Sequence, residues 1–243
     1  MEPAESFIRL IDVSKVFYNH GSALVVLKHT RLGFRRGEFV ALVGPSGSGK
    51  TTLLSLIGGV MRPTKGSIVI DGKEVTSLSE DKWAIFRRSY IGFVFQSHNL
   101  IGPLTAYENV EIPMILAGIK RRDRELQVPR VLRLTETYAL RDRPAQDLSG
   151  GEQQRLAIAR AIVMNPLIIL ADEPTGELDT ETGSRIMEAL RHISRERNVT
   201  VIVATHDQLL VERSDRTLWI RDGWIKADGV HTDIGNFSLP SRN

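Results

Sequence analysis

The chain contains no cysteine among its 243 residues, so disulfide bonds and cysteine-based metal or redox sites are excluded. Long apolar runs are also missing, since no uninterrupted stretch approaches the roughly 20 residues that a transmembrane helix needs. The first five residues, MEPAE, lack the positive start and apolar core of a signal peptide. We therefore expect a cytoplasmic chain whose membrane-spanning part, if it acts at a membrane, is a separate partner.

The chain has little excess of either charge sign. Its 32 Lys and Arg residues and 29 Asp and Glu residues give a net charge of +3 and a pI of about 9.3. This excess is too small to predict binding to nucleic acid. The basic residues between Lys120 and Arg143 are interleaved with acidic ones, which a solvated helix face explains. The length suits one large domain with a sizeable core.

The most informative segment that is present lies at residues 44–52, between an apolar run and a helical pattern. It consists of Gly44, Pro45, Ser46, Gly47, Ser48, Gly49, Lys50, Thr51 and Thr52. This order matches the phosphate-loop pattern G-x-x-x-x-G-K-[ST], in which backbone N–H groups at a helix start surround the phosphates of a nucleotide. Lys50 is expected to contact the outer phosphates, and the Thr51 hydroxyl to bind Mg²⁺.

The distribution of strand and helix patterns predicts an α/β fold of the phosphate-loop (RecA-like) type in a single domain, 1–243. Short strands expected at 7–17, 24–27 and 31–34 precede the loop, which indicates an antiparallel sheet beside a parallel one. From residue 97 to about 165 strand patterns give way to helical periodicity. We therefore predict a nucleotide-binding core at 1–96 and 166–228, an inserted helical subdomain at 97–165, and a loosely ordered tail at 229–243.

Four polar residues follow apolar runs that are typical of buried strands: Asp172, Glu173, His206 and Gln96. Ligands of an open parallel sheet bind at the carboxyl ends of its strands. Asp172 is expected to hold Mg²⁺, Glu173 to orient the attacking water, and His206 to contact the terminal phosphate. Gln96 is expected to reach Mg²⁺ or the water. Each residue alone also has an ordinary structural explanation, but the phosphate loop favours the catalytic one.

A second potential anion site begins at Ser149. Gly150 and Gly151 follow it and open a helical pattern, and Ser149 can cap that helix. A glycine-rich connection to a helix is the structural alternative. Two phosphate-binding helix starts in different subdomains are more than one nucleotide needs, which indicates that the second serves another copy of the chain.

Taken in order, the phosphate loop, Gln96, residues 148–155 (LSGGEQQR), the Asp172–Glu173 pair and His206 resemble the ATP-binding subunits of ABC transporters. The resemblance covers about residues 7–225. Within this superfamily, three segments are similar to those of the branch that contains macrolide exporters and lipoprotein-release ATPases: residues 92–96, 108–110 and 171–176. That branch also includes cell-division and antibiotic-resistance ATPases.

The resemblance implies a head-to-tail homodimer that sandwiches two ATP molecules with Mg²⁺. Each ATP would contact the phosphate loop of one copy and Ser149, Gly150 and Gly151 of the other. Asp179 would lie at the dimer seam, and Phe17, or alternatively Tyr18, would stack on adenine. The partner would be an integral-membrane permease, which places the protein on the inner face of the cell membrane.

Three residues depart from that branch: Glu177 stands where asparagine is usual, and His98 and Met61 also replace commoner residues. His98 lies in the loop that is expected to face the permease. The main alternative function is a signalling module whose ATP cycle moves a membrane partner without pumping a substrate. A DNA-repair ATPase would need a long coiled-coil insertion, and a small-molecule kinase would leave residues 149–151 unexplained.

Overall fold

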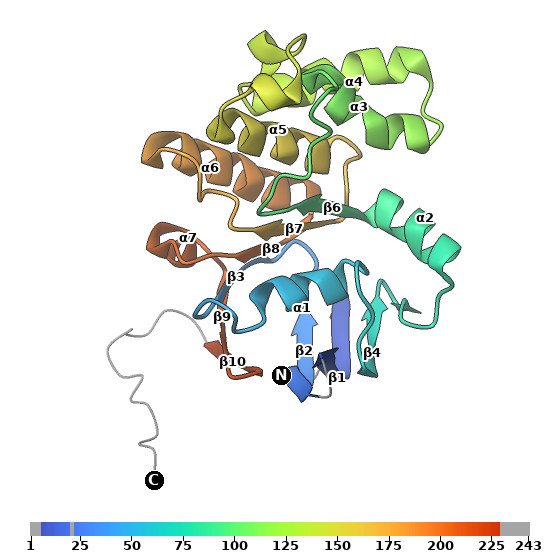
Figure 1. Cartoon of the computed structure of the whole chain (residues 1–243), viewed down its shortest axis with the longest axis vertical. Helices are drawn as coiled ribbons and strands as arrows, with labels where there is room; N and C mark the ends of the chain where they lie inside the picture. The colour runs from blue at the N-terminus through green and yellow to red at the C-terminus, as the bar shows by residue number, and fades with distance from the viewer. Residues whose placement is uncertain (1–5, 20–21, 229–243) are drawn as a thin grey trace.

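Two β-sheets lie on opposite sides of helix α1 (Lys50–Ile57) in the lower half of the molecule (Figure 1). The computed structural model describes residues 6–19 and 22–228. The antiparallel sheet has the order β2-β1-β4-β5 and consists of β1 (Ile8–Asn19), β2 (Ser22–Phe34), β4 (Lys65–Ile70) and β5 (Lys73–Glu74).

The second sheet is parallel except for one edge strand, and its order is β10-β9-β3-β8-β7-β6. Its strands are β3 (Phe39–Val43), β6 (Ile91–Val94), β7 (Ile168–Asp172), β8 (Thr200–Ala204), β9 (Arg216–Arg221) and β10 (Trp224–Asp228). Because β6, β7 and β8 are adjacent and parallel, their carboxyl ends meet at one edge. The combination of a parallel and an antiparallel sheet confirms the predicted fold class.

The remaining helices lie mostly above the parallel sheet in Figure 1. They are α2 (Glu80–Tyr90), α3 (Ala106–Leu116), α4 (Arg121–Leu134), α5 (Gly150–Ile162), α6 (Thr180–Arg197) and α7 (Gln208–Glu212), with short 3₁₀ turns at Tyr138–Leu140 and Ala145–Asp147. None of the helices in the described part of the chain combines the length and apolar character that crossing a membrane requires.

The alternation of side chains along β7 explains how one strand joins two hydrophobic cores. Ile168 and Leu170 pack in the cluster that contains α1 and the antiparallel sheet. Ile169 and Ala171 face the other way, into the cluster shared with α5 and α6. Since successive side chains of a strand point to opposite faces, a strand covered on both faces is apolar throughout. All five residues of β7 are buried, and its end is therefore held rigidly.

One sequence expectation needs correction. The strands expected at 24–27 and 31–34 are one strand, β2, which continues through an irregular pairing region. His29 there has a φ of 43°, and its ring lies 3.2 Å from the Asp12 carboxylate, so the polar residues mark a bulge rather than a turn. The predicted tail at 229–243 lies outside the described residues. The subdomain boundaries at 96/97 and 165/166 stay predictions.

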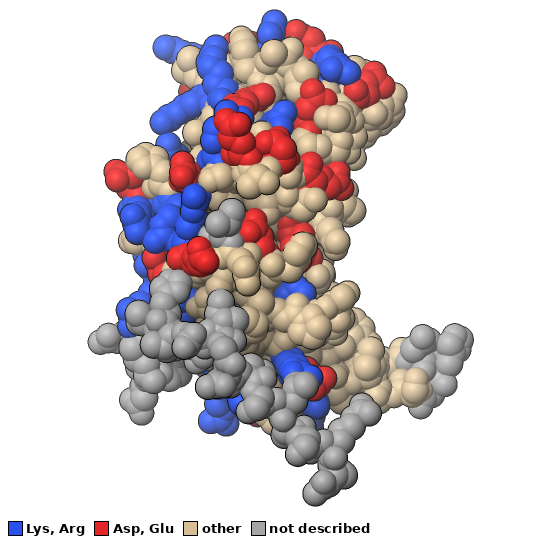
Figure 2. Space-filling view, turned by 90° about the vertical axis from the view of Figure 1, so that its left-hand side faces the viewer, with Lys and Arg blue, Asp and Glu red and all other residues tan. Residues whose placement is uncertain are grey.

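Charged side chains are mixed on the face shown in Figure 2, where Lys and Arg lie among Asp and Glu. Over the part of that face formed by the described residues, neither sign covers a large continuous area. This agrees with the small net charge of +3.

Candidate nucleotide-binding site

The phosphate loop connects β3 to α1. The side chain of Lys50, at the start of α1, folds back onto backbone carbonyl groups of the loop. Gly49, which immediately precedes α1, has a φ of 108°, a conformation that a side chain would strain. Lys50 Nζ donates to Gly44 O at 2.8 Å and to Pro45 O at 3.2 Å. The ammonium group is therefore held above the loop, where anionic oxygens would meet it together with the positive end of α1.

A cavity of about 610 Å³ opens over this loop, within the size range of small-molecule sites. Its lining residues come from the loop, from β2 and from the ends of the strands: Phe17, Leu24, Val26, Gly44, Pro45, Ser46, Gly47, Gly49, Lys50, Thr51, Thr52, Gln96, Asp172, Glu173 and His206. Phe17 lines the cavity, whereas Tyr18 is absent from the lining and is 77% exposed. Ser48 is buried and does not line it.

Leu24 and Val26 were missed by the sequence reasoning. They lie on β2, opposite the end of β1 that carries Phe17, and Phe17 pairs with Leu24 in the sheet. Their apolar side chains extend the wall beside the Phe17 ring. The sequence offered one signal for them, the apolar run on the expected strand at 24–27. In the structure Leu24 of this strand is 65% exposed.

The Thr51 hydroxyl donates a hydrogen bond of 2.6 Å to Asp172 Oδ2, joining the start of α1 to the end of β7. Asp172 is only 3% exposed, and burial raises the pKa of its carboxyl group, with the Thr51 hydrogen bond acting in the opposite direction. A desolvated carboxylate beside a hydroxyl is suited to a hard cation. Both groups are oxygen donors, and Mg²⁺ prefers oxygen ligands and keeps several waters.

No group of three or more His, Asp or Glu side chains that could hold a metal ion occurs in residues 6–19 and 22–228. A magnesium ion here would therefore use Asp172, the Thr51 hydroxyl, the Gln96 amide, phosphate oxygens and water. Gln96 is exposed at the end of β6 and lines the same cavity. The donor set fits Mg²⁺ bound together with a nucleotide.

Glu173 and His206 meet across the ends of β7 and β8. Glu173 Oε2 lies 2.9 Å from His206 Nδ1, and the Glu173 backbone N–H donates to Ala204 O at 2.9 Å. Glu173 has a φ of 49°, a left-handed conformation that is uncommon for a residue with a side chain and tends to occur at functional sites. Its carboxylate, 17% exposed, lies at the cavity wall and can accept a proton from a water molecule.

Ser149, Gly150, Gly151 and Asp179 do not line this cavity. Ser149 caps α5 in a capping box, in which Ser149 N donates to Glu152 Oε2 at 2.8 Å and Glu152 N donates to Ser149 Oγ at 3.4 Å. The hydrogen bond from the Ser149 backbone lowers the pKa of Glu152. Asp179 caps α6 by accepting from Thr182 N at 2.9 Å. Within one copy these residues lie at helix starts, where Ser149 and Asp179 are exposed and Gly150 and Gly151 are half-buried.

Removal of the Thr51 hydroxyl tests the metal assignment. In Thr51→Val we expect half-maximal hydrolysis to need about tenfold more Mg²⁺ or worse, because an oxygen ligand and the partner of Asp172 are both lost. The measurement is the rate of phosphate release as a function of Mg²⁺ concentration. A sample in which a chelator removes Mg²⁺ gives the rate without metal. Ser55→Ala, one turn further along α1, removes a hydroxyl outside the cavity and controls for packing. An unchanged Mg²⁺ requirement in Thr51→Val would contradict the assignment.

Comparison with known proteins agrees with this geometry. The family model described as ABC transporter matches residues 27–176. The chain is 48% identical over 230 residues to the macrolide export ATP-binding/permease protein MacB of Brucella abortus (strain 2308), covering 93% of this chain and 35% of that protein. It thus spans about a third of the length of that relative. It is also 42% identical over 224 residues to the lipoprotein-releasing system ATP-binding protein LolD of Geobacter metallireducens, covering 92% of this chain and 99% of the relative.

Among solved structures, the fold is similar to that of the ATP-binding cassette MJ0796, described as a dimeric structure of a post-hydrolysis state bound to ADP and Pi. The TM-score is 0.88 at 39% sequence identity, covering 93% of this chain and 100% of that one. A protein of the same name in Methanocaldococcus jannaschii is called an uncharacterized ABC transporter ATP-binding protein.

Proposed function

The chain belongs to the ABC transporter family as an ATP-binding and ATP-hydrolysing subunit, and we propose that two copies of it close around two ATP molecules to drive a transmembrane permease. The observation that carries this proposal is the convergence of Lys50, Thr51, Asp172, Glu173 and His206 on one cavity at the end of a parallel sheet. Release of phosphate from ATP by the purified chain, with no phosphorylated acceptor, tests the reaction class.

We propose the following division of labour within the cavity. Lys50 and the loop amides bind the phosphates, and the Phe17 ring packs against adenine. Thr51, Gln96 and Asp172 hold Mg²⁺, which when bound offsets the negative charge that develops on the phosphate oxygens. Glu173 orients the attacking water and accepts its proton. His206 supports the Glu173 carboxylate from 2.9 Å away and can donate to the terminal phosphate.

The second copy would complete each site. Ser149 and Asp179 are both exposed, and the N–H groups at the start of α5 have no nucleotide of their own to bind, since that helix start is not part of the cavity. Packing against another copy would bring α5 to the terminal phosphate of the ATP held there. Binding at two such sites turns phosphate contacts into closure of the dimer, and hydrolysis would reopen it.

The permease partner and the location follow from the same proposal. The names of MacB and LolD describe macrolide export and lipoprotein release, and we propose a permease of that general type, with this chain at the cytoplasmic face of the membrane. The loop between Gln96 and Asn109 would receive it. The buried Asn109 side chain fixes this loop by accepting from Ile101 N and donating to Ile101 O and Leu104 O.

His98 does not present its side chain to such a partner, because it is only 7% exposed. Ile101, which is 48% exposed, is the apolar side chain that the Asn109 contacts hold on the loop surface. We therefore propose Ile101 as the docking contact on this loop in place of His98.

Ile101→Glu is expected to reduce co-purification with the membrane partner at least about tenfold, because a buried charge is costly in an apolar contact. Membrane extracts are captured on the tagged chain, and the partner is identified by its transmembrane segments. Hydrolysis by the isolated variant serves as the folding control. Full recovery of the partner by Ile101→Glu would contradict this docking site, and capture without ATP-dependent transport would favour a signalling role.

A further inference from the structure

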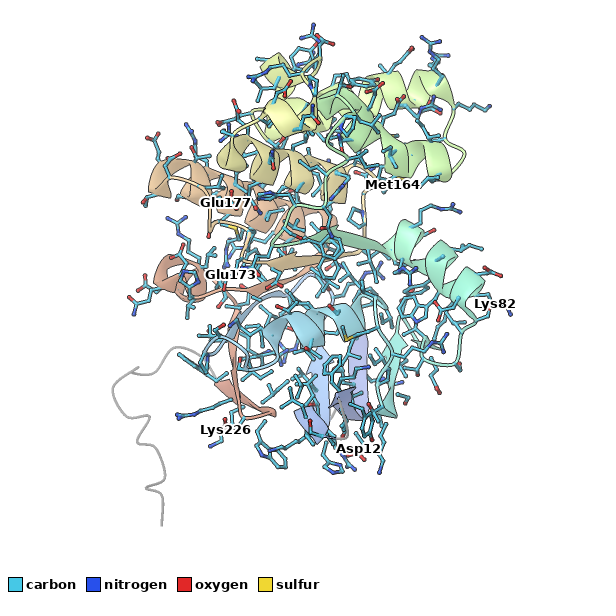
Figure 3. All side chains as sticks on the ribbon, in the orientation of Figure 1. Asp12, Lys82, Met164, Glu173, Glu177 and Lys226 are labelled. Carbon is cyan, nitrogen blue, oxygen red and sulfur yellow. The ribbon has the colours of Figure 1, made fainter. Side chains whose placement is uncertain are left out.

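Glu177 lies in the segment between the catalytic-site residue Glu173 and the α6 cap Asp179. Its carboxylate packs directly against the start of α5: a methyl group on Gly150 would collide with Glu177 Oε2. A methyl group on Gly151 would lie 3.1 Å from the Glu177 backbone oxygen. A side chain at position 150 would therefore force the Glu177 carboxylate to move away from α5. In Figure 3 the labelled Glu177 lies above Glu173 on the same side of the molecule.

A buried histidine faces the other oxygen of the same carboxylate. His98 Nε2 lies 3.8 Å from Glu177 Oε1 and makes no hydrogen bond within the described residues. The loop that carries His98 is itself anchored to α5, because Arg160 donates to His98 O at 2.6 Å and to Asn99 O at 2.5 Å. The Glu177 side chain, although 51% exposed, therefore contacts two segments that both belong to the α5 region.

This arrangement places a negative charge beside the helix start that the proposed function assigns to the terminal phosphate of ATP. The positive end of α5 stabilises the Glu177 carboxylate in the isolated copy. An incoming phosphate would meet that carboxylate at short range, and like charges repel. With asparagine at this position the contribution of residue 177 to that repulsion would be missing, and the Glu152 carboxylate of the capping box would be the negative group left at this helix start.

We propose that Glu177 is a positioning residue that opposes ATP-driven closure of the dimer by holding a negative charge against Gly150. It sets the ATP concentration at which two copies close, and it has no part in the chemical step at Glu173. The inference rests on the proposed function, since it assumes that residues 149–151 of one copy meet the ATP of the other.

The test compares Glu177→Gln, Glu177→Asp and Glu125→Gln, each added to a Glu173→Gln parent in which ATP is bound but not hydrolysed. Dimer formation is followed by size-exclusion chromatography against ATP concentration. Glu177→Gln keeps the shape and removes the charge, whereas Glu177→Asp keeps the charge and draws it back from Gly150. Glu125 lies on α4, where it pairs with Arg121, and controls for net charge.

We expect Glu177→Gln to form half the dimer at an ATP concentration roughly three- to tenfold lower than the parent. The shift should shrink in roughly 0.5 M salt, where surface charges are screened, a response that a purely structural role would not give. Glu177→Asp should lie between the two, and Glu125→Gln should match the parent. With Glu173 intact, Glu177→Gln should lower the half-saturating ATP concentration and change kcat by less than about twofold.

An equal or higher ATP requirement in Glu177→Gln would overturn the inference, and so would a shift that persists unchanged at high salt. Should Glu177→Gln unfold, which its thermal melting would reveal, Glu177→Asn must show the lower requirement instead. If the Glu173→Gln parent itself formed no dimer with ATP, the proposed function would fail and the inference with it, which separates the two failures.

Discussion

Replacing Glu173 with glutamine is expected to slow ATP hydrolysis by about a hundredfold or more, because a positioned general base contributes that much to proton transfer. The amide has nearly the same shape but cannot take a proton from water. ATP binding should persist, since Glu173 lies at the cavity wall while Lys50 and the loop amides are the groups proposed to bind the phosphates. The variant should accumulate as a dimer with ATP bound.

The measurements are phosphate release, nucleotide binding by fluorescence and mass by light scattering. Glu212→Gln makes the same substitution at an exposed position on α7 and should hydrolyse ATP like the unaltered chain. Normal hydrolysis by Glu173→Gln would show that another group activates the water.

Placing a carboxylate at the start of α5 is expected to abolish hydrolysis as completely as losing the general base. In Ser149→Glu the new charge would occupy the position proposed for the terminal phosphate of the other copy's ATP, so closed dimers should not form. Binding of ATP to the variant's own phosphate loop should remain, because Ser149 does not line that cavity.

Helix α3 offers a matched control for this substitution. Thr105 caps α3 in the same capping box, with Glu108 in the place of Glu152. Thr105→Glu and Ser149→Glu should therefore lose similar stability, about 1 kcal/mol each for the cap. Only Ser149→Glu should lose hydrolysis. Equal loss in both variants would mean that the capping of a helix, rather than an anion site, explains Ser149.

The sequence predicted the placement of the candidate residues best where a residue stands at the end of a parallel strand. Gln96, Asp172 and His206 each follow a buried run, and the pairing of β6, β7 and β8 brings those ends together. The contact of Glu173 with His206 follows from that adjacency. The sequence could predict this placement because the end of a strand is visible in the local pattern. Parallel strands then end at the same edge of the sheet, where ligands bind.

Residues on loops were less predictable, because their neighbours come from distant segments. The buried His98 contacts Arg160 and Glu177, which lie 62 and 79 positions away in the chain (160 − 98 and 177 − 98). The contact of Glu177 with Gly150 likewise has no local signal beyond the glycine itself. The continuity of β2 was missed since a polar bulge at His29 resembles a turn.

The central claim is that each catalytic centre contains the phosphate loop of one copy and residues 149–151 of another. Mixing two inactive variants tests it most directly: Lys50→Ala, which lacks the phosphate-binding ammonium, and Ser149→Glu, in which a carboxylate blocks the opposing helix start. The mixed dimer has one centre with both parts intact, so ATP hydrolysis should reappear on mixing and rise with the fraction of mixed dimer. If each chain built its centre alone, the mixture would stay as inactive as its components.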